Sequence, residues 1–145
     1  MNKKLTPLAF LSFILILASV NFLSNEIPAP QEQTRVLKTG YKNITSTQLK
    51  EMFEDKNFFL VNVHIPYEGE IEKTDVFIPY DEIEKNLDKL PKNKNAKIVL
   101  YCQTGRMSAI AAQRLTKLGY TDVYNHLFGM HDWQSKGYPL LEKGE

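Results

Sequence analysis

The sequence has one cysteine, no internal repeat and almost no excess charge of either sign. A single cysteine among 145 residues excludes an intramolecular disulfide, so this thiol stays free or reacts with another molecule. The 18 basic and 17 acidic residues give a net charge of +1, which removes the electrostatic argument for a nucleic-acid partner. The histidines, His64, His126 and His131, show no regular metal-binding spacing and lie far from Cys102 in sequence, which argues against a zinc site.

The longest apolar stretch lies within residues 1–24. Lys3 and Lys4 precede an apolar run of about 19 residues, a marginal length for a membrane span. We expect an uncleaved anchor, with a cleavable signal peptide as the alternative. The folded part then lies outside the cytoplasm, bound to the membrane in the first case and exported to the periplasm or medium in the second.

Residues 25–40 are polar, contain prolines and show no sustained period, so they are interpreted as a tether. The remaining residues, 41–145, are enough for one domain with one sizeable core. Short apolar runs alternate with amphipathic segments in this part. The first amphipathic segment begins with a capping box, in which Gln48 follows Thr45 by three residues. This alternation predicts the α/β class, with a central, mostly parallel sheet flanked by helices on both faces. The predicted strands and helices occupy residues 58–65, 76–79, 83–90, 96–101, 107–118, 122–127 and 129–137.

The predicted helix at 107–118 has an amphipathic pattern. Its inward residues are expected to be Ile110, Ala111, Leu115 and Leu118. Gly119 stands where a helix commonly ends with a left-handed residue.

The cysteine lies in the stretch "LYCQTGRMSAIAAQRL", between a predicted strand and this helix. Ligands bind at the carboxyl edge of parallel sheets, and Cys102 directly follows the strand there. The loop can turn backbone N–H groups toward the sulfur, and the helix adds its positive end, so both favour the thiolate. Gly105 permits a tight turn and Arg106 supplies a fixed cation for an oxyanion. A nucleophilic cysteine is predicted, with a small buried hydrophobic residue as the alternative.

His64 ends a predicted strand at the same edge of the sheet. It is expected to lie beside the loop of Cys102, or else to be a partly exposed histidine at a strand end.

The loop of Cys102 and the stretch that follows it resemble the single-domain rhodaneses, a family of sulfurtransferases. The family's active loop reads Cys-x-x-Gly-x-Arg between a strand and a helix, and this chain has "CQTGRM". The following "SAIAAQRLTKLGYTDVYNHLFGMHDW" is similar to the family's stretch that ends in a glycine-rich turn and a tryptophan. The resemblance runs from Asn43 to Tyr138 and is strongest from Val99 to Trp133.

The resemblance implies a function for the loop. Cys102 would attack the outer sulfur of thiosulfate, a polysulfide or a persulfide donor, hold it as a persulfide and pass it to a thiol or cyanide. The implied substrate-binding residues are Gln103, Thr104, Gly105, Arg106, Met107 and Ser108. The implied partners are a small sulfur-containing anion or persulfide donor and a thiol acceptor, with no metal, organic cofactor or nucleic acid. The membrane is a further partner, through the N-terminal segment.

The chain departs from the family pattern at three places, one of which is the family's Gly-His-Ile-Pro-Gly-Ala segment, reduced here to Gly69 and Ile71. The family's loop arginine is the sixth residue, where this chain has Met107, and Arg106 is the fifth. The family's first strand ends in Asp-Val-Arg, whereas residues 62–64 read "NVH". A non-catalytic rhodanese-like module for binding or redox sensing therefore remains an alternative.

A cysteine phosphatase or arsenate reductase requires Cys-x5-Arg, and Ser108 stands where that arginine would be.

Overall fold

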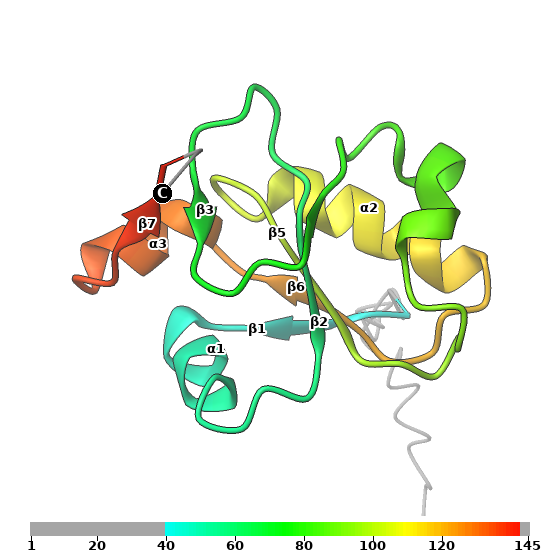
Figure 1. Ribbon diagram of the computed structural model, residues 1–145, viewed down its shortest axis with the longest axis horizontal. Coiled ribbons are helices and arrows are strands. Elements are labelled where there is room, and N and C mark those ends of the chain that lie inside the picture. The colour runs from blue at the N-terminus through cyan, green and yellow to red at the C-terminus, as the bar shows by residue number, and fades with distance from the viewer. Residues whose placement is uncertain (1–39, 143–145) are drawn as a thin grey trace, which may run out of the picture. The chain divides into compact units, whose positions relative to one another are not determined.

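The computed structural model describes residues 40–142 of the chain (Figure 1). The predicted anchor or signal at residues 1–24 lies outside the described residues, as does the predicted tether apart from its last residue. Within the described part, no helix is long and apolar enough to cross a bilayer.

A five-stranded parallel sheet forms the centre of the domain, as the alternating sequence pattern predicts. The elements in chain order are β1 (Lys42–Ile44), α1 (Ser46–Met52), β2 (Phe59–Asn62), β3 (Glu70–Ile71), β4 (Val76–Phe77), η1 (Ile83–Lys89), β5 (Ile98–Tyr101), α2 (Arg106–Lys117), β6 (Val123–His126), α3 (Gly129–Ser135) and β7 (Leu140–Leu141). The strand order in the sheet is β1-β6-β5-β2-β4, and every neighbouring pair is parallel. The carboxyl ends of all five strands therefore lie at one edge of the sheet.

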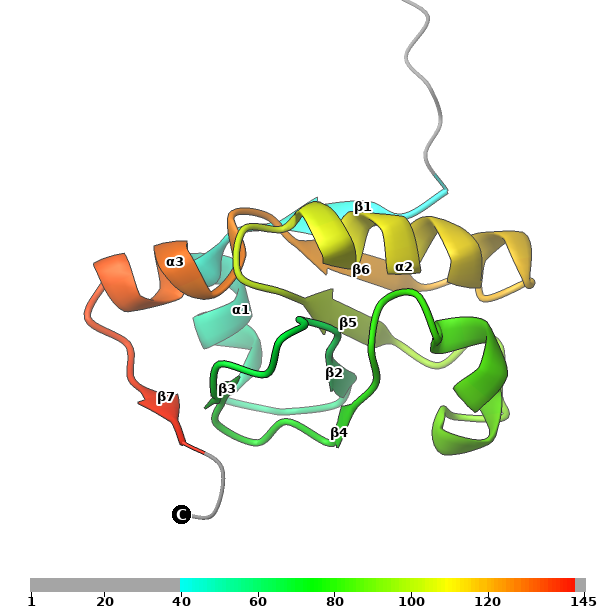
Figure 2. The ribbon, with the colours of Figure 1, turned by 90° about the horizontal axis from the view of Figure 1, so that it is seen from above.

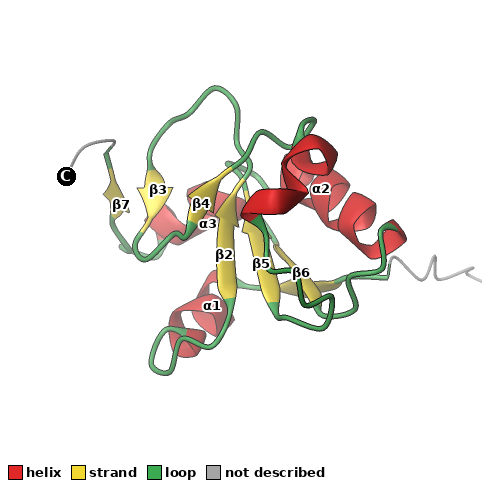
Figure 3. Cartoon of the chain, turned by 45° about the vertical axis from the view of Figure 1, so that its right-hand side comes forward, coloured by secondary structure: helices red, strands yellow, loops and turns green. Residues whose placement is uncertain are grey.

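Helices cover both faces of this sheet (Figure 3). One core lies between the sheet and α2 with η1, and includes Val61 and Leu115. The other lies between the sheet and α1 with α3, and includes Leu60 and Trp133. Successive residues of β2 and β5 alternate between the two cores, which explains why these strands are apolar along their length. The α/β class with helices on both faces is confirmed.

The capping box predicted from Thr45 and Gln48 begins α1. The hydroxyl of Thr45 accepts the N–H of Gln48 at 3.2 Å, and the Gln48 side chain accepts the N–H of Thr45 at 2.9 Å. Two backbone donors that the helix leaves unpaired are thereby satisfied.

The buried face of α2 agrees with the expected one at Ala111 and Leu115 and differs from it elsewhere. Its buried residues are Ser108, Ala111, Ala112 and Leu115. The expectation for Ile110 and Leu118 is wrong, because they are 37% and 38% exposed. The buried stripe follows helical spacing from Ser108, a polar residue that an apolar pattern does not select. Gly119 ends the helix with a φ of +91°, as expected.

Three short strands are not evident from the sequence pattern. β1 has three residues and joins the edge of the sheet beside β6, while β3 and β7 have two each and form an antiparallel pair. Runs this short show no alternation. The helix expected near residues 83–90 is the 3-10 helix η1, whose Asn86 has non-helical dihedral angles.

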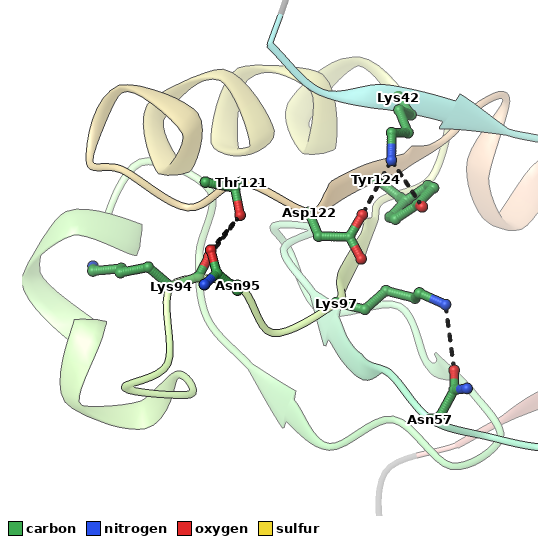
Figure 4. Close-up of polar contacts among 8 residues, drawn as sticks. All are labelled: Lys42, Asn57, Lys94, Asn95, Lys97, Thr121, Asp122 and Tyr124. Carbon is green, nitrogen blue, oxygen red and sulfur yellow. Dashed lines mark hydrogen bonds and ion pairs between the residues drawn. The ribbon is translucent and has the colours of Figure 1, made fainter.

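Polar contacts hold the amino edge of the sheet, opposite the carboxyl edge (Figure 4). The Lys42 ammonium donates to the Asp122 carboxylate and to the Tyr124 hydroxyl, both at 3.2 Å. The Thr121 hydroxyl donates to the Asn95 side-chain oxygen at 2.8 Å. These contacts join the start of β6 to β1 on one side and to the segment before β5 on the other.

Candidate active site

The predicted reactive loop lies between β5, which ends at Tyr101, and α2, which begins at Arg106. It is therefore at the carboxyl edge of the parallel sheet, as expected. Cys102 is the first residue of the loop and is only 1% exposed. Its Sγ accepts a hydrogen bond from the Gly105 N–H, with an N···S distance of 3.1 Å. Gly105 has a φ of +85°, so the backbone can turn back onto the sulfur.

A second donor reaches the sulfur from α2. The Ser108 hydroxyl oxygen lies 3.4 Å from Cys102 Sγ, and Ser108 is fully buried. α2 has 12 residues and no acidic residue in its first turn, so its N-terminal end carries an unopposed partial positive charge. The N–H, the hydroxyl and the N-terminal end of α2 are thus all close to the sulfur of Cys102.

The start of α3 holds the loop from the other side (Figure 2). The Met130 N–H donates to the Cys102 carbonyl at 2.9 Å, and the His131 N–H donates to the Gln103 carbonyl at 3.0 Å. Gly129 makes this approach possible, because a Cβ there would collide with the Cys102 carbonyl oxygen. The backbone of the loop is therefore fixed by two neighbouring elements.

The predicted binding residues differ in their exposure. Thr104 and Arg106 are exposed, Gln103 and Met107 are half-buried, and Gly105 and Ser108 are buried. No ion pair joins Arg106 to any other residue in the range 40–142. Its exposed guanidinium can therefore bind an anion without breaking an existing ion pair.

His64 is linked to the loop through a residue that the sequence did not reveal. Its Nε2 lies 2.9 Å from Glu68 Oε2, and the same oxygen accepts a hydrogen bond from the Gln103 side-chain amide at 2.6 Å. The His64 side chain is only 7% exposed. The expectation that His64 lies beside the loop agrees with this geometry, in which Glu68 bridges the two. Glu68 lies in an irregular segment, and no sequence pattern marks it.

Asn125 is a second site residue that sequence reasoning missed. Its side-chain oxygen accepts the Ser108 hydroxyl at 2.6 Å, and its amide nitrogen donates to the Asn43 side chain at 2.9 Å. Asn125 is 2% exposed. A signal was present, because Asn125 follows the buried Val123 by two residues in a strand and so lies on the same face. A polar residue at an inward position of a buried strand needs a polar partner.

His126 is buried against the opposite core. Its Nε2 lies 2.8 Å from the Ser46 hydroxyl oxygen, and its ring packs edge-on against Trp133. Burial lowers the pKa of His126 to about 4, although the nearby Asp132 carboxylate opposes this shift. The ring is thus neutral near pH 7 and belongs to the packing of α1 and α3 against the sheet. Among residues 40–142, no group of three acidic, histidine or cysteine side chains is placed to hold a metal ion.

A sequence model of the rhodanese-like domain matches residues 45–136, which is more than half of the chain. The chain belongs to the rhodanese-like domain family. The family resemblance inferred from the cysteine loop is therefore confirmed, and this rhodanese-like domain spans nearly all of the described residues.

Two of the known proteins that are similar in sequence to this rhodanese-like domain come from fission yeast and Bacillus subtilis. A putative mitochondrial thiosulfate sulfurtransferase of Schizosaccharomyces pombe is 33% identical, with 68% of this chain and 83% of that protein covered. The putative sulfur carrier protein YrkF of Bacillus subtilis is 41% identical over 61 residues, with 42% of this chain covered. The match covers 32% of YrkF, so the chain spans about a third of that relative.

A crystal structure shows the same fold. The rhodanese-like domain protein of Staphylococcus aureus superposes with a TM-score of 0.61 and 33% identity, with 72% of this chain and 99% of that chain covered.

Proposed function

We propose that this rhodanese-like domain is a sulfurtransferase in which Cys102 carries a sulfane sulfur as a persulfide. The observation that carries the proposal is the contact of Cys102 Sγ with the Gly105 N–H at the start of α2. Such a position lowers the free energy of the thiolate, which is the nucleophilic form. The name of the fission-yeast relative, a putative thiosulfate sulfurtransferase, supports the same chemistry.

The reaction takes place in two displacements. The Cys102 thiolate attacks the outer sulfur of thiosulfate, a polysulfide or a persulfide. The sulfur–sulfur bond of the donor breaks, and sulfite, the shortened polysulfide or a thiolate leaves with the bonding electron pair. An acceptor thiolate or cyanide then attacks the outer sulfur on Cys102, and Sγ leaves as the thiolate.

The loop residues have distinct parts in this scheme. The Gly105 N–H and the Ser108 hydroxyl stabilise the sulfur when it is anionic, both before the first displacement and after the second. Arg106 attracts an anionic donor through its exposed guanidinium. Gln103, which Glu68 holds, borders the reacting cysteine. The Cys-x5-Arg chemistry of phosphatases has no counterpart here, since Ser108 points its hydroxyl to Asn125 and Cys102.

The test is a turnover assay on the full chain. The chain is mixed with thiosulfate or inorganic polysulfide as donor and with cyanide or dithiothreitol as acceptor, beside a Cys102→Ser variant. The expected result is that the unmodified chain forms thiocyanate or sulfide faster than the uncatalysed reaction, whereas the Cys102→Ser variant does not. A folded chain that turns over none of these pairs would contradict the proposal and favour a non-catalytic binding or redox-sensing module.

A further inference from the structure

A chain of four polar side chains runs from the reactive sulfur to the edge strand β1. Ser108 Oγ lies 3.4 Å from Cys102 Sγ and 2.6 Å from Asn125 Oδ1, and Asn125 Nδ2 lies 2.9 Å from Asn43 Oδ1. Ser108 and Asn125 are buried, whereas Asn43 is exposed. Because bulk water reaches only the Asn43 end, the inner groups must satisfy one another.

The hydroxyl of Ser108 has one proton and two acceptors within reach. At 2.6 Å the Asn125 oxygen is the closer acceptor, and a protonated Cys102 can then donate its own S–H to the Ser108 oxygen. A thiolate has no proton to donate and needs the proton of Ser108 instead. If Ser108 turns its proton to the sulfur, the buried Asn125 oxygen loses its donor, which is costly.

A half-turn of the Asn125 side-chain amide removes this conflict. The turn exchanges its oxygen and nitrogen while the heavy atoms keep nearly the same places. The Asn125 NH₂ group then donates to Ser108, and its oxygen accepts from the amide of Asn43, which turns in the same way. Asn43 is exposed, so its turn breaks no buried contact. In this second arrangement the donors run from Asn43 to the sulfur without a gap.

We propose that Asn125, anchored by Asn43, is a positioning residue that decides whether the Ser108 hydroxyl donates to the sulfur of Cys102. The inference rests on the proposed function, because the thiolate and the anionic persulfide are its reacting states. Asn125 does not touch the sulfur or the donor. It acts through Ser108, by providing or withdrawing an acceptor for the one hydroxyl proton.

Several charged or titratable groups surround the loop without joining this chain of side chains. They are Arg106 from α2, His64 and Glu68 from the segment after β2, and His131 from α3. Across residues 40–142, no hydrogen bond or ion pair joins any of them to Ser108 or Asn125. None of these groups therefore provides a second hydrogen-bonded route from Asn125 to the sulfur.

The experiment measures the pH midpoint of thiolate formation from its ultraviolet absorbance on the full chain. Each variant is paired with the same background carrying Cys102→Ser, so that ionisation of the seven tyrosines cancels. Ser108→Ala removes the donor and is expected to raise the midpoint by about one pH unit, the size of a hydrogen bond to a charged group. The ionised side chain of Asn125→Asp accepts hydrogen bonds but cannot donate one. It therefore keeps the Ser108 proton directed away from the sulfur, and the variant is expected to raise the midpoint by a similar amount.

The double variant separates the proposed route from a simple effect of charge. If Asn125→Asp acts through Ser108, it adds nothing once Ser108→Ala has removed the hydroxyl. A carboxylate that acts by charge alone raises the midpoint further in the Ser108→Ala background, by as much as in the unmodified chain. That result, or the absence of any shift on Asn125→Asp, would overturn the proposal.

A variant on the exposed end tests the route without risk to the buried core. The carboxylate of Asn43→Asp only accepts hydrogen bonds, so it holds the Asn125 amide with its nitrogen toward residue 43 and its oxygen toward Ser108. The variant is expected to raise the midpoint of thiolate formation by about half a pH unit. The shift is expected to persist at about 1 M salt, which screens charges beyond about 3 Å, and Asn43→Ala is the matched control. Equal midpoints for the two variants, or loss of the shift in salt, would contradict the proposal. The titration uses no sulfur donor, so its outcome is independent of whether the chain transfers sulfur.

Discussion

Cys102 and His126 are both buried ionisable residues, but the groups around them differ. The sulfur of Cys102 meets an N–H group, a hydroxyl and the positive end of α2, all of which stabilise an anion. The ring of His126 contacts Trp133 and a serine hydroxyl, and its Nδ1 has no hydrogen-bond partner within residues 40–142. Burial there disfavours the cation. His126 therefore contributes to packing, whereas Cys102 is the residue that we propose as the nucleophile.

The surroundings of His126 predict a pH dependence of stability. Its pKa is about 4 in the folded chain and about 6.5 when unfolded. Between these values only the unfolded chain binds the proton, so the free energy of unfolding falls as the pH decreases from 6.5 to 4. The loss from this residue is about 3 kcal/mol.

Urea unfolding at several pH values measures this dependence. The variant His126→Gln removes the titrating ring, so its free energy of unfolding is expected to fall less steeply in this range. The slope is the readout, since the substitution can change stability by a constant amount at every pH. Equal slopes for the two chains would show that His126 is not the group responsible.

At the scale of elements, the turn into α3 determines where the reactive loop lies. Phe128, the residue before α3, has a φ of +66° and is 58% exposed. A bulky side chain in this left-handed conformation costs about 1–2 kcal/mol. Gly129 follows with a φ of +57° and lies against the Cys102 carbonyl. The turn therefore stores backbone strain next to the loop of Cys102. Such strain is common at functional sites in proteins.

This strain predicts that Phe128→Gly stabilises the domain. Glycine adopts the conformation freely but has more freedom in the unfolded chain, so the expected gain is about 0.5–1 kcal/mol. Phe128→Ala removes the same exposed ring while it keeps the strain, and is the matched control. The midpoint of urea unfolding is expected to be higher for Phe128→Gly than for Phe128→Ala. The reverse order would contradict the account of the turn.

The sequence predicts the elements that have strong local signals. The capping box of α1, the buried strands β2 and β5 and the placement of Cys102 between a strand and a helix are all confirmed. The buried face of α2 is predicted only in part: Ala111 and Leu115 are buried as expected, but Ser108 points inward for a polar reason that hydrophobic periodicity cannot detect. The bridge from Glu68 to Gln103 joins segments distant in sequence, and β1, β3 and β7 are too short for a pattern. Tertiary contacts, rather than local preferences, determine these features.

At the scale of the whole molecule, the parallel sheet separates two kinds of contact. Its carboxyl edge carries the loop of Cys102, and its amino edge carries the ion pair and hydrogen bonds of Lys42. Two apolar cores on opposite faces hold the strands between them. The described residues begin near the amino edge with β1, and the loop of Cys102 lies at the opposite edge.

We propose from sequence alone that residues 1–24 hold the chain at a membrane. Cell fractionation tests this localisation in the native host. The full chain is expected in the membrane pellet after an alkaline wash, with its first residues still present by mass spectrometry. A chain that begins at residue 41 is the control and is expected in the supernatant. Recovery of the full chain from the cytoplasmic supernatant would contradict the predicted anchor and the predicted export together.

Intact mass spectrometry of the full chain after incubation with inorganic polysulfide tests the central claim most directly. The account predicts a gain of one sulfur atom, which requires Cys102, is absent from Cys102→Ser and disappears on addition of cyanide or a thiol. The cysteine is the chain's only one, so the site of addition is unambiguous. A folded chain whose mass does not change with polysulfide, thiosulfate or a persulfide donor would contradict the persulfide mechanism.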